Sequence, residues 1–363
     1  MFSLAAGALI FAGSISASIG QNATTDPVGV VTLDASGSSD TAICPPLQRP
    51  KVFSGSIGDA SGAQLTIQGA QGWQPNQFAY SSPAQLNTYY ALVKSGARAG
   101  AFYTVTGNGE SSLTVDLAGD NLEAVLEEGD LIEVVPYWTL NTLFPGGQGF
   151  KPSSSFTPVS TLVIPNPTQA GAGLPASDKY FYYSGAAAGG AGWRKVGGAP
   201  TAKYNDLPLP PDSHFIVRHN SSGDTKLQIL GDVRMVGSQT AIGTIQQNTK
   251  QDNHIGFPFP VPLILAQSQL YESGAVSGSS TFTPTDVVLV YDNSIKTLNK
   301  PPTLKYFYYT GAAAGGPGWR KVGSAPTAKF DSQVVFEVGA GVVIQKSENS
   351  SPSFALFSTP RPF

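Results

Sequence analysis

Short runs of hydrophobic residues, many alternating with polar ones, follow one another along this chain, and turn residues separate them. The runs are rich in Val, Ile, Thr, Tyr and Phe, and clusters of Gly, Pro, Asn and Asp lie between them, which is typical of an all-β protein. The predicted strands are 28–33, 52–57, 64–68, 88–93, 101–106, 112–117, 130–135, 161–164, 180–183, 193–196, 214–219, 226–230, 287–291, 306–309, 319–322, 334–338, 342–345 and 354–357. Only residues 121–128 predict a helical turn, because Leu122 and Val125 are spaced i, i+3.

A long internal repeat is the most specific feature of the sequence. Residues 179–203 recur at 305–329, with 22 of 25 positions identical. The same offset of 126 continues upstream without a gap, so that Pro136 corresponds to Pro262. Downstream the match weakens, and 215–218 correspond to 342–345 only after a shift of one residue. Such a repeat predicts two copies of one structural unit.

A second, fainter repeat has an offset of 212. It relates Asp40, Ile43, Pro46 and Pro50 to Asp252, Ile255, Pro258 and Pro262. We interpret it as a strand and a Pro-rich turn that introduce each unit. The chain is therefore predicted to hold several small antiparallel β-sandwich or barrel-like modules, with one short helical turn and an internal duplication. The predicted divisions are a signal peptide (1–20), an N-terminal β module (21–135), a first repeat unit (136–261) and a shorter second unit (262–363).

The repeated block is predicted to form a hairpin with aromatic side chains on both faces. Tyr180 and Tyr182 point to one face and Phe181 to the other, which predicts packing on both sides. A loop of Gly and Ala leads to the return strand, where Arg194 or Lys195 is a candidate to stack on a Tyr ring. The candidate interface or glycan-stacking residues of the two hairpins are Tyr180, Tyr182, Trp193, Arg194, Tyr306, Tyr308, Trp319 and Arg320. The alternative for the same side chains is a buried β core, since aromatic residues dominate core energetics.

Composition narrows the classes of function. Charged residues make up 12% of the chain and the net charge is −3, so a nucleic-acid binder, which needs a basic surface, is excluded. Residues 1–20 are small or apolar and resemble the hydrophobic core and cleavage region of a secretory signal, although no positive charge precedes Arg49. No later segment is apolar for long enough to cross a membrane as a helix, so the mature chain is expected to have no transmembrane segment.

Residues that carry chemistry are few. Cys44 is the single cysteine, so the chain cannot form an internal disulfide. Of the three histidines, His214 and His219 are five apart on one predicted strand and point to opposite faces, so we expect solvated or core-edge residues rather than metal ligands. The Gly/Ala loops lack the Lys-Ser/Thr of a phosphate-binding loop and the third Gly of a dinucleotide site. We therefore predict no catalytic residues, no metal and no cofactor.

Acidic residues are concentrated in one segment of the chain, 116–133. They are Asp116, Asp120, Glu123, Glu127, Glu128, Asp130 and Glu133. We interpret this concentration first as a solvated face. The alternatives are a cation site and the carboxylate pair of a glycoside hydrolase.

Several motifs together resemble a paralogous family of uncharacterised exported proteins from Verrucomicrobia-type bacteria. The motifs are Thr24-Thr25-Asp26-Pro27-Val28-Gly29, Pro45-Pro46-Leu47-Gln48-Arg49-Pro50, the run from Gly129 to Leu140, Tyr182-Tyr183, and Trp193-Arg194-Lys195-Val196-Gly197. The resemblance implies export and many copies per genome, and it supplies no catalytic residues. This chain departs from the family in its uncharged signal segment and its duplicated second unit.

The sequence thus predicts an exported, non-catalytic structural protein rather than an enzyme. Its low charge gives weak self-repulsion, and open strand edges allow pairing, so the expected partners are copies of itself or paralogues in a cell-surface or extracellular filament or layer. Association with the outer membrane or a periplasmic location also fits an exported chain. The alternatives are a glycan-binding module with Tyr and Trp platforms and polysaccharide as its partner, and a glycoside hydrolase.

Overall fold

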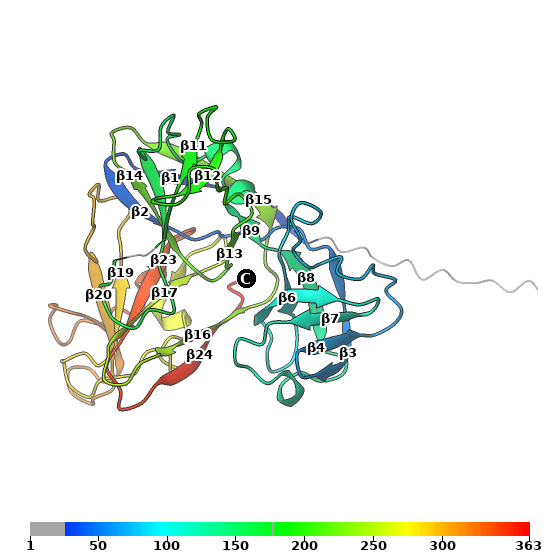
Figure 1. Cartoon of the computed structure of the whole chain (residues 1–363). Coiled ribbons are helices and arrows are strands. Elements are labelled where there is room, and N and C mark those ends of the chain that lie inside the picture. The colour runs from blue at the N-terminus through cyan, green and yellow to red at the C-terminus, as the bar shows by residue number, and fades with distance from the viewer. Residues whose placement is uncertain (1–25, 176–177) are drawn as a thin grey trace, which may run out of the picture.

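The structure is a computed structural model that describes residues 26–175 and 178–363, so the predicted signal peptide lies outside the described residues. The described chain is nearly all β, as the sequence predicts (Figure 1). Its helical elements are α1 (Leu140–Leu143) and the 3-10 turns η1 (Leu122–Ala124), η2 (Pro145–Gly147) and η3 (Leu265–Gln267). No helix among these residues is both long and apolar enough to cross a bilayer.

The predicted helical turn over 121–128 is much shorter in the structure. Only η1 is helical, because the Asp130 carboxylate accepts a hydrogen bond from the Glu127 amide (3.0 Å) and turns the chain toward the next strand. Helix α1 is not predicted from the sequence. Thr139 caps its N-terminus: the Thr139 hydroxyl accepts from the Thr142 amide (3.2 Å), and the Thr139 amide donates to the Thr142 hydroxyl (2.8 Å).

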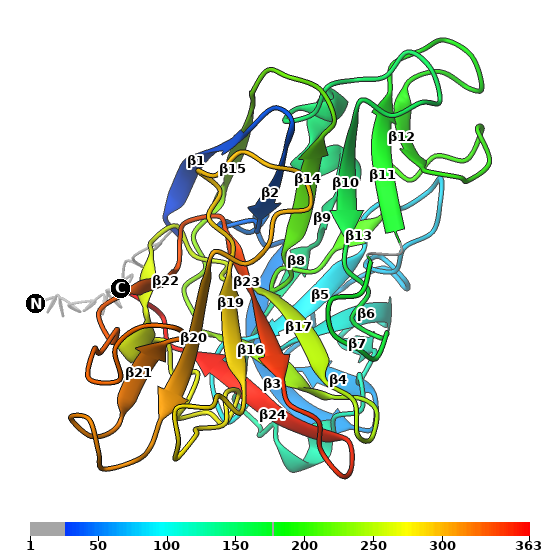
Figure 2. The same ribbon diagram turned by 90° about the vertical axis from the view of Figure 1, so that its left-hand side faces the viewer.

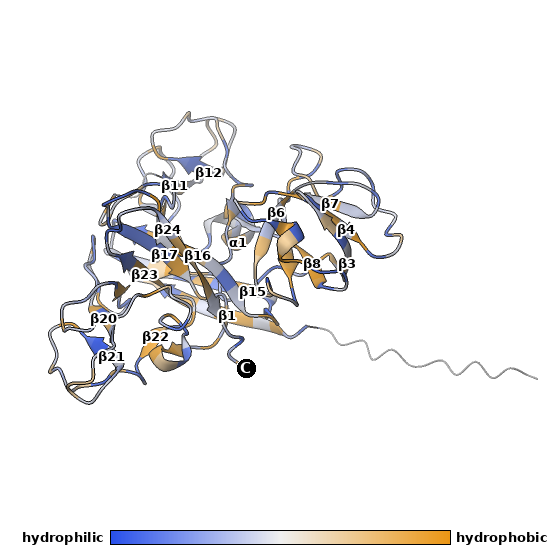
Figure 3. Ribbon diagram, turned by 90° about the horizontal axis from the view of Figure 1, so that it is seen from below, coloured by the Kyte–Doolittle hydropathy of each residue, from blue (hydrophilic) through white to orange (hydrophobic). Residues whose placement is uncertain are grey.

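The first module is a closed barrel of six strands. Their order around the barrel is β3 (Phe53–Ser61), β4 (Gln64–Ile67), β7 (Ser112–Val115), β6 (Phe102–Asn108), β5 (Tyr89–Val93) and β8 (Leu131–Pro136), with all pairs antiparallel. Strands β4 and β7 alternate exposed and buried residues, and their buried Leu and Val side chains fill the interior. The barrel lies to one side of the rest of the molecule, and hydrophobic residues are prominent on β4 and β8 (Figure 3).

Two five-stranded antiparallel sheets form the remainder, and we call them the first and the second sheet. The first sheet has the order β12 (Gly192–Lys195), β11 (Asp178–Tyr183), β10 (Ser160–Ile164), β14 (Phe215–His219) and β2 (Ser39–Ile43). The second has the order β21 (Gly318–Lys321), β20 (Leu304–Tyr309), β19 (Val287–Val290), β23 (Gly341–Lys346) and β17 (Gln251–Gly256). In Figure 2 the first sheet lies above the second.

Strand pairing confirms both sequence repeats. Leu162 pairs with Val217 in the first sheet, and Val288 pairs with Ile344 in the second, which reproduces the offset of 126 and the downstream shift of one residue. The edge strands β2 and β17 are equivalent with the offset of 212, since Asp40 lies opposite Arg218 and Asp252 lies opposite Gln345. Each sheet therefore takes its edge strand from upstream of the boundaries at 136 and 262, and the barrel is inserted between β2 and β10.

Short paired segments complete each unit. Each unit has one long two-stranded ribbon, and the two ribbons are equivalent. In the first, β1 (Val28–Ala35) pairs with β15 (Thr225–Asp232), and in the second, β16 (Ser238–Thr244) pairs with β24 (Ser353–Thr359). Each unit also has one pair of very short strands, and these two pairs are equivalent. β9 (Trp138–Thr139) pairs with β13 (Pro208–Leu209), and β18 (Leu263–Ile264) pairs with β22 (Val334–Phe336). One face of each ribbon packs on the core of its own unit, through residues such as Ile229 and Phe357.

Candidate binding site

The eight candidate residues of the repeated hairpins lie mainly inside the protein. Tyr180 and Trp193 belong to the core beneath the first sheet, and Tyr306 and Trp319 to the core beneath the second. Trp193 is 0% exposed and Trp319 1%. Phe181 and Tyr183, on the opposite face, are also buried, so the prediction that the hairpin packs on both sides is confirmed. As placed, neither indole presents a face to a ligand.

The two partly buried tyrosines are also covered by their own chain. A Cβ atom at Gly147 would lie 2.6 Å from the Tyr182 ring, and Gly147 has φ = 80°, so glycine is required there for two reasons. Tyr308 stacks on Tyr271 with 3.7 Å between ring centroids. The structure therefore uses these side chains for packing within one chain.

Each hairpin also buries its arginine. The Arg194 guanidinium lies 5.6 Å from the centroid of the Tyr183 ring, which confirms the predicted stacking. It also donates hydrogen bonds to the carbonyls of Pro200 (2.8 Å) and Gly190 (2.7 Å) and so ties the Gly/Ala loop to the return strand. Arg320 makes the same contacts in the second unit. This loop-closing role is not predicted from the sequence, although the recurrence of Arg together with its Gly/Ala loop is a signal for it.

The acidic concentration near the barrel does not form one site. Asp120 binds Arg98 (2.7 Å) and the Tyr103 hydroxyl (2.7 Å), and these bonds hold the pKa of its carboxyl well below the usual range. Glu133 is buried and binds two lysines, while the Glu123 carboxylate accepts from the Gly62 amide (2.6 Å). Each of these carboxylates has its own structural partner.

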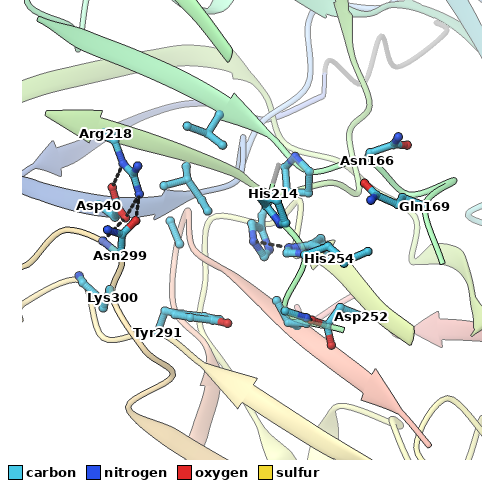
Figure 4. Close-up of a pocket in the computed structure, with 18 of the residues that line it drawn as sticks. Asp40, Asn166, Gln169, His214, Arg218, Asp252, His254, Tyr291, Asn299 and Lys300 are labelled. Carbon is cyan, nitrogen blue, oxygen red and sulfur yellow. Dashed lines mark hydrogen bonds and ion pairs between the residues drawn. The ribbon is translucent and has the colours of Figure 1, made fainter. Parts of the chain in front are cut away.

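A cavity of about 390 Å³ lies between the facing sides of the two sheets (Figure 4). Strands β2, β10 and β14 line one side, and β17 and β23 line the other. The loops that follow β10 and β19 complete the wall. Local sequence patterns do not indicate this site, because its residues come from segments as far apart as Asp40 and Val343.

The two units meet around an approximate twofold axis, and backbone hydrogen bonds record it. The Asp40 amide donates to the carbonyl of Thr297 (3.0 Å), and the equivalent Asp252 amide donates to the equivalent carbonyl of Gly171 (3.0 Å). In the same way, Cys44 donates to Gly339 (2.7 Å), and Gly256 donates to Asp212 (2.6 Å). Each unit therefore reaches across to the edge strand of the other.

Side chains near this axis differ between the units because they would collide if they were alike. A Cβ atom on Gly256 would overlap the Cys44 thiol, and one on Gly341 would overlap the His214 side chain. Gly256 is the counterpart of Cys44, and Gly341 that of His214. One unit thus carries the side chains and the other carries the glycines. Burial raises the pKa of the Cys44 thiol, which is a free cysteine.

Two histidines form the floor of the cavity. The Nδ1 of His254 lies 3.2 Å from the Nε2 of His214, and the Nδ1 of His214 lies 3.3 Å from the Ile255 carbonyl. Since that carbonyl can only accept, His214 donates from Nδ1, and its Nε2 accepts the proton of His254. Burial, and then the facing His254, lower the pKa of His214 to about 3, and burial lowers that of His254 to about 4.

The solvated alternative for the histidines is therefore wrong for His214 and His219. His214 and His219 do lie on opposite faces, but both are buried. His219 faces the first core, where its ring nitrogens meet the hydroxyls of Ser160 (2.6 Å) and Thr225 (2.8 Å). Polar partners made burial possible, and nothing in the local sequence indicates them.

Equivalent carboxylates stand at the two ends of the cavity. Asp40 accepts two hydrogen bonds from Arg218 (both 2.7 Å) and one from the Asn299 amide (2.8 Å). Asp252 accepts from the Gln345 side chain (2.9 Å) and from the amide of Gly173, the counterpart of Asn299 (2.7 Å). The ion pair at one end is thus replaced at the other by neutral donors, which leaves Asp252 without a cationic partner among the described residues.

The cavity offers hydrogen-bonding groups rather than a metal centre. Among residues 26–175 and 178–363 no group of three or more His, Cys, Asp or Glu side chains is arranged to hold a metal ion. Comparison of the whole chain with models of protein families, with curated proteins and with solved structures finds no match.

Proposed function

We propose that this protein is an exported, non-catalytic structural subunit that assembles with copies of itself. One observation carries the proposal. The four most exposed large hydrophobic side chains of the described residues all lie on the two equivalent ribbons: Val28 (66%), Phe354 (65%), Leu230 (63%) and Val30 (62%). Leu356, 42% exposed, lies beside Phe354 on the same face.

These side chains form one apolar face on each ribbon. Val30 lies directly opposite Leu230 in the ladder, and Val28 follows two positions along the same face. On the other ribbon, Phe354 and Leu356 lie opposite Gly243 and Ala241. Contiguous exposed apolar surface of this kind is typical of protein–protein contacts.

The ribbons also have open edges. In the described part of the chain each ribbon contains only two strands. Gln48 is hydrogen-bonded to Asp232 of β15, and Gly100 and Asn253 are hydrogen-bonded to β16, so the open edges are those of β1 and β24. An isolated pair of strands is marginally stable, and addition of a further strand satisfies its free amides and carbonyls. Because the duplication places one such ribbon on each unit, two copies of the chain can pair repeatedly and extend an assembly.

Low charge supports the same proposal. With 12% charged residues and a net charge of −3, copies repel each other only weakly. The outward face of the β16–β24 ribbon carries only uncharged residues over its whole length. Export rests on the small and apolar residues 1–20 together with the low charge of the whole chain.

Size measurement of the mature protein tests this proposal. We expect the chain without residues 1–20 to form particles larger than a monomer in light scattering and ordered assemblies in negative-stain micrographs. Val30→Lys and Phe354→Lys should each shift the protein toward monomer. Leu131→Lys is the matched control, since Leu131 is 49% exposed but lies on the barrel. A wild-type monomer at high concentration, or equal effects of all three substitutions, would refute the proposal.

A further inference from the structure

The cavity between the sheets has polar groups that the protein itself does not use. Among the described residues, neither the Tyr291 hydroxyl nor the Lys179 ammonium has a hydrogen-bond partner, and both side chains line the cavity. The His254 Nε2 is also free, because the hydrogen bond to His214 uses Nδ1. In Figure 4 the Tyr291 hydroxyl points toward the middle of the cavity, between Lys300 and Asp252. All three side chains are half-buried, so their free polar groups are available to a polar occupant of the cavity.

The charge of the wall favours an anion. It carries three cationic side chains, Lys179, Arg218 and Lys300, and two carboxylates, Asp40 and Asp252. Arg218 is neutralised by Asp40, whereas the two lysines form no ion pair with any carboxylate of the described chain.

Neighbouring carboxylates form no ion pair with the two lysines, although Asp292 and Asp40 lie near enough to Lys300 to attract its charge. Asp178, next to Lys179, binds Lys195 instead (2.7 Å). Lys300 donates to the Asp292 carbonyl (2.8 Å), which leaves two of its three protons free. Among the side chains that line the cavity, three positive and two negative charges leave an excess of one positive charge. A single negative charge on a ligand would balance it.

The remaining walls favour a small organic molecule over an inorganic ion. Ala42, Ile216 and Val163 lie side by side across the first sheet, and Val343 faces them from the second. A volume of about 390 Å³ lies near the lower end of the range for small-molecule sites. Asp252 and the free His254 nitrogen accept hydrogen bonds, so an occupant with hydroxyl groups would be matched by both donors and acceptors.

We propose that the cavity between the two sheets binds a small hydroxylated organic monoanion of the sugar-acid class. Its carboxylate is held by Lys179, its hydroxyls by Tyr291, Asp252 and His254, and its apolar face by the first sheet. This site is independent of the ribbons and of self-assembly.

Calorimetric titration with D-glucuronate tests the proposal, with D-glucose as the neutral probe of similar shape. We expect D-glucuronate to bind the mature protein at least tenfold more tightly than D-glucose. Lys179→Met should weaken D-glucuronate about tenfold, which corresponds to the loss of one charge-assisted hydrogen bond. Lys305→Met is the matched control, because Lys305 is the counterpart of Lys179 in the second unit but is exposed and does not line the cavity.

A second variant keeps the test informative if Lys179→Met fails to fold. Tyr291→Phe removes only a hydroxyl and should weaken both sugars several-fold. Failure of D-glucuronate to bind, equal affinity for the two probes, or an equal loss in the Lys179 and Lys305 variants would each overturn the proposal.

Discussion

The His214–His254 pair makes the stability of this protein depend on pH, and substitution of one histidine should show it. In the folded protein the pKa values are lowered to about 3 and about 4, mainly by burial. In the unfolded chain an imidazole titrates near 6.5. The unfolded state therefore binds protons that the folded state does not, and the free energy of unfolding falls as the pH drops below about 6.5.

The magnitude follows from these values. At pH 5 nearly every imidazole of the unfolded chain is protonated, whereas both members of the pair remain neutral in the folded protein. Each therefore costs about 2 kcal/mol relative to pH 7.5, and the pair costs about 4 kcal/mol. This is a large share of the stability of a typical domain, which is about 5–15 kcal/mol. No carboxylate in the described chain forms an ion pair with either imidazole to offset the loss.

The test is His254→Gln, which removes the titrating group but keeps an amide that can donate to the Nε2 of His214. We expect the loss of stability between pH 7.5 and pH 5 to shrink by about 2 kcal/mol relative to wild type. Urea unfolding at a series of pH values measures it. Asp34→Asn, an exposed change of charge on the ribbon, is the control and should leave the pH dependence unchanged.

Other titrating groups contribute equally to the pH dependence of stability in the wild type and in His254→Gln. Burial raises the pKa of Asp212, so its contribution to the free energy of unfolding is lost as the pH rises. This effect is opposite in sign to that of the histidine pair. His219, with its pKa lowered to about 4, lowers the free energy of unfolding at acid pH, as the histidine pair does. Both effects cancel in the difference between wild type and variant. Identical pH dependence of wild type and His254→Gln would refute the assignment of this acid sensitivity to the histidine pair.

Three further substitutions test the packing, each by chemical or thermal unfolding. Trp193→Ala should cost about 3–5 kcal/mol, because the indole is wholly buried in the first core, and a loss below 1 kcal/mol would contradict that placement. Gly341→Ala should cost about 1–3 kcal/mol through overlap with His214, whereas Gly58→Ala, where a Cβ meets only ordinary contacts, should change little. Lys346→Met should cost about 3–5 kcal/mol, because it leaves the fully buried Asp286 carboxylate without its ion-pair partner.

The sequence predicted the class of fold because local patterns determine it. Alternating residues and turn clusters located most of the strands, and the strands of the two repeated hairpins were located to within about two residues. Edge strand β2 was missed because Ser39–Ile43 has no alternation: all five residues are buried. The only signal for it was the faint repeat at 212, which relates Asp40 to Asp252.

The candidate site could not be predicted in the same way. Its walls depend on how two sheets face each other, and no local pattern records that arrangement. Arg194 shows the limit for a single residue. A basic side chain is normally exposed, yet this one is buried because carbonyls of its own loop accept its protons. The aromatic side chains were predicted with two alternatives, sugar platform or core, and only the tertiary contacts distinguish them.

Because the two units belong to one chain, equivalent positions in them can carry different residues. At a true twofold axis both copies carry the same residue, so two side chains as large as that of His214 would meet where the structure has room for one. In a single chain one copy can keep His214 while the other has Gly341, and His254 can have the small Ala42 as its counterpart. The same freedom allows Arg218 at one end of the cavity and Gln345 at the other. A polar, asymmetric cavity is thus a consequence of joining the two units covalently, and two identical subunits could not build it.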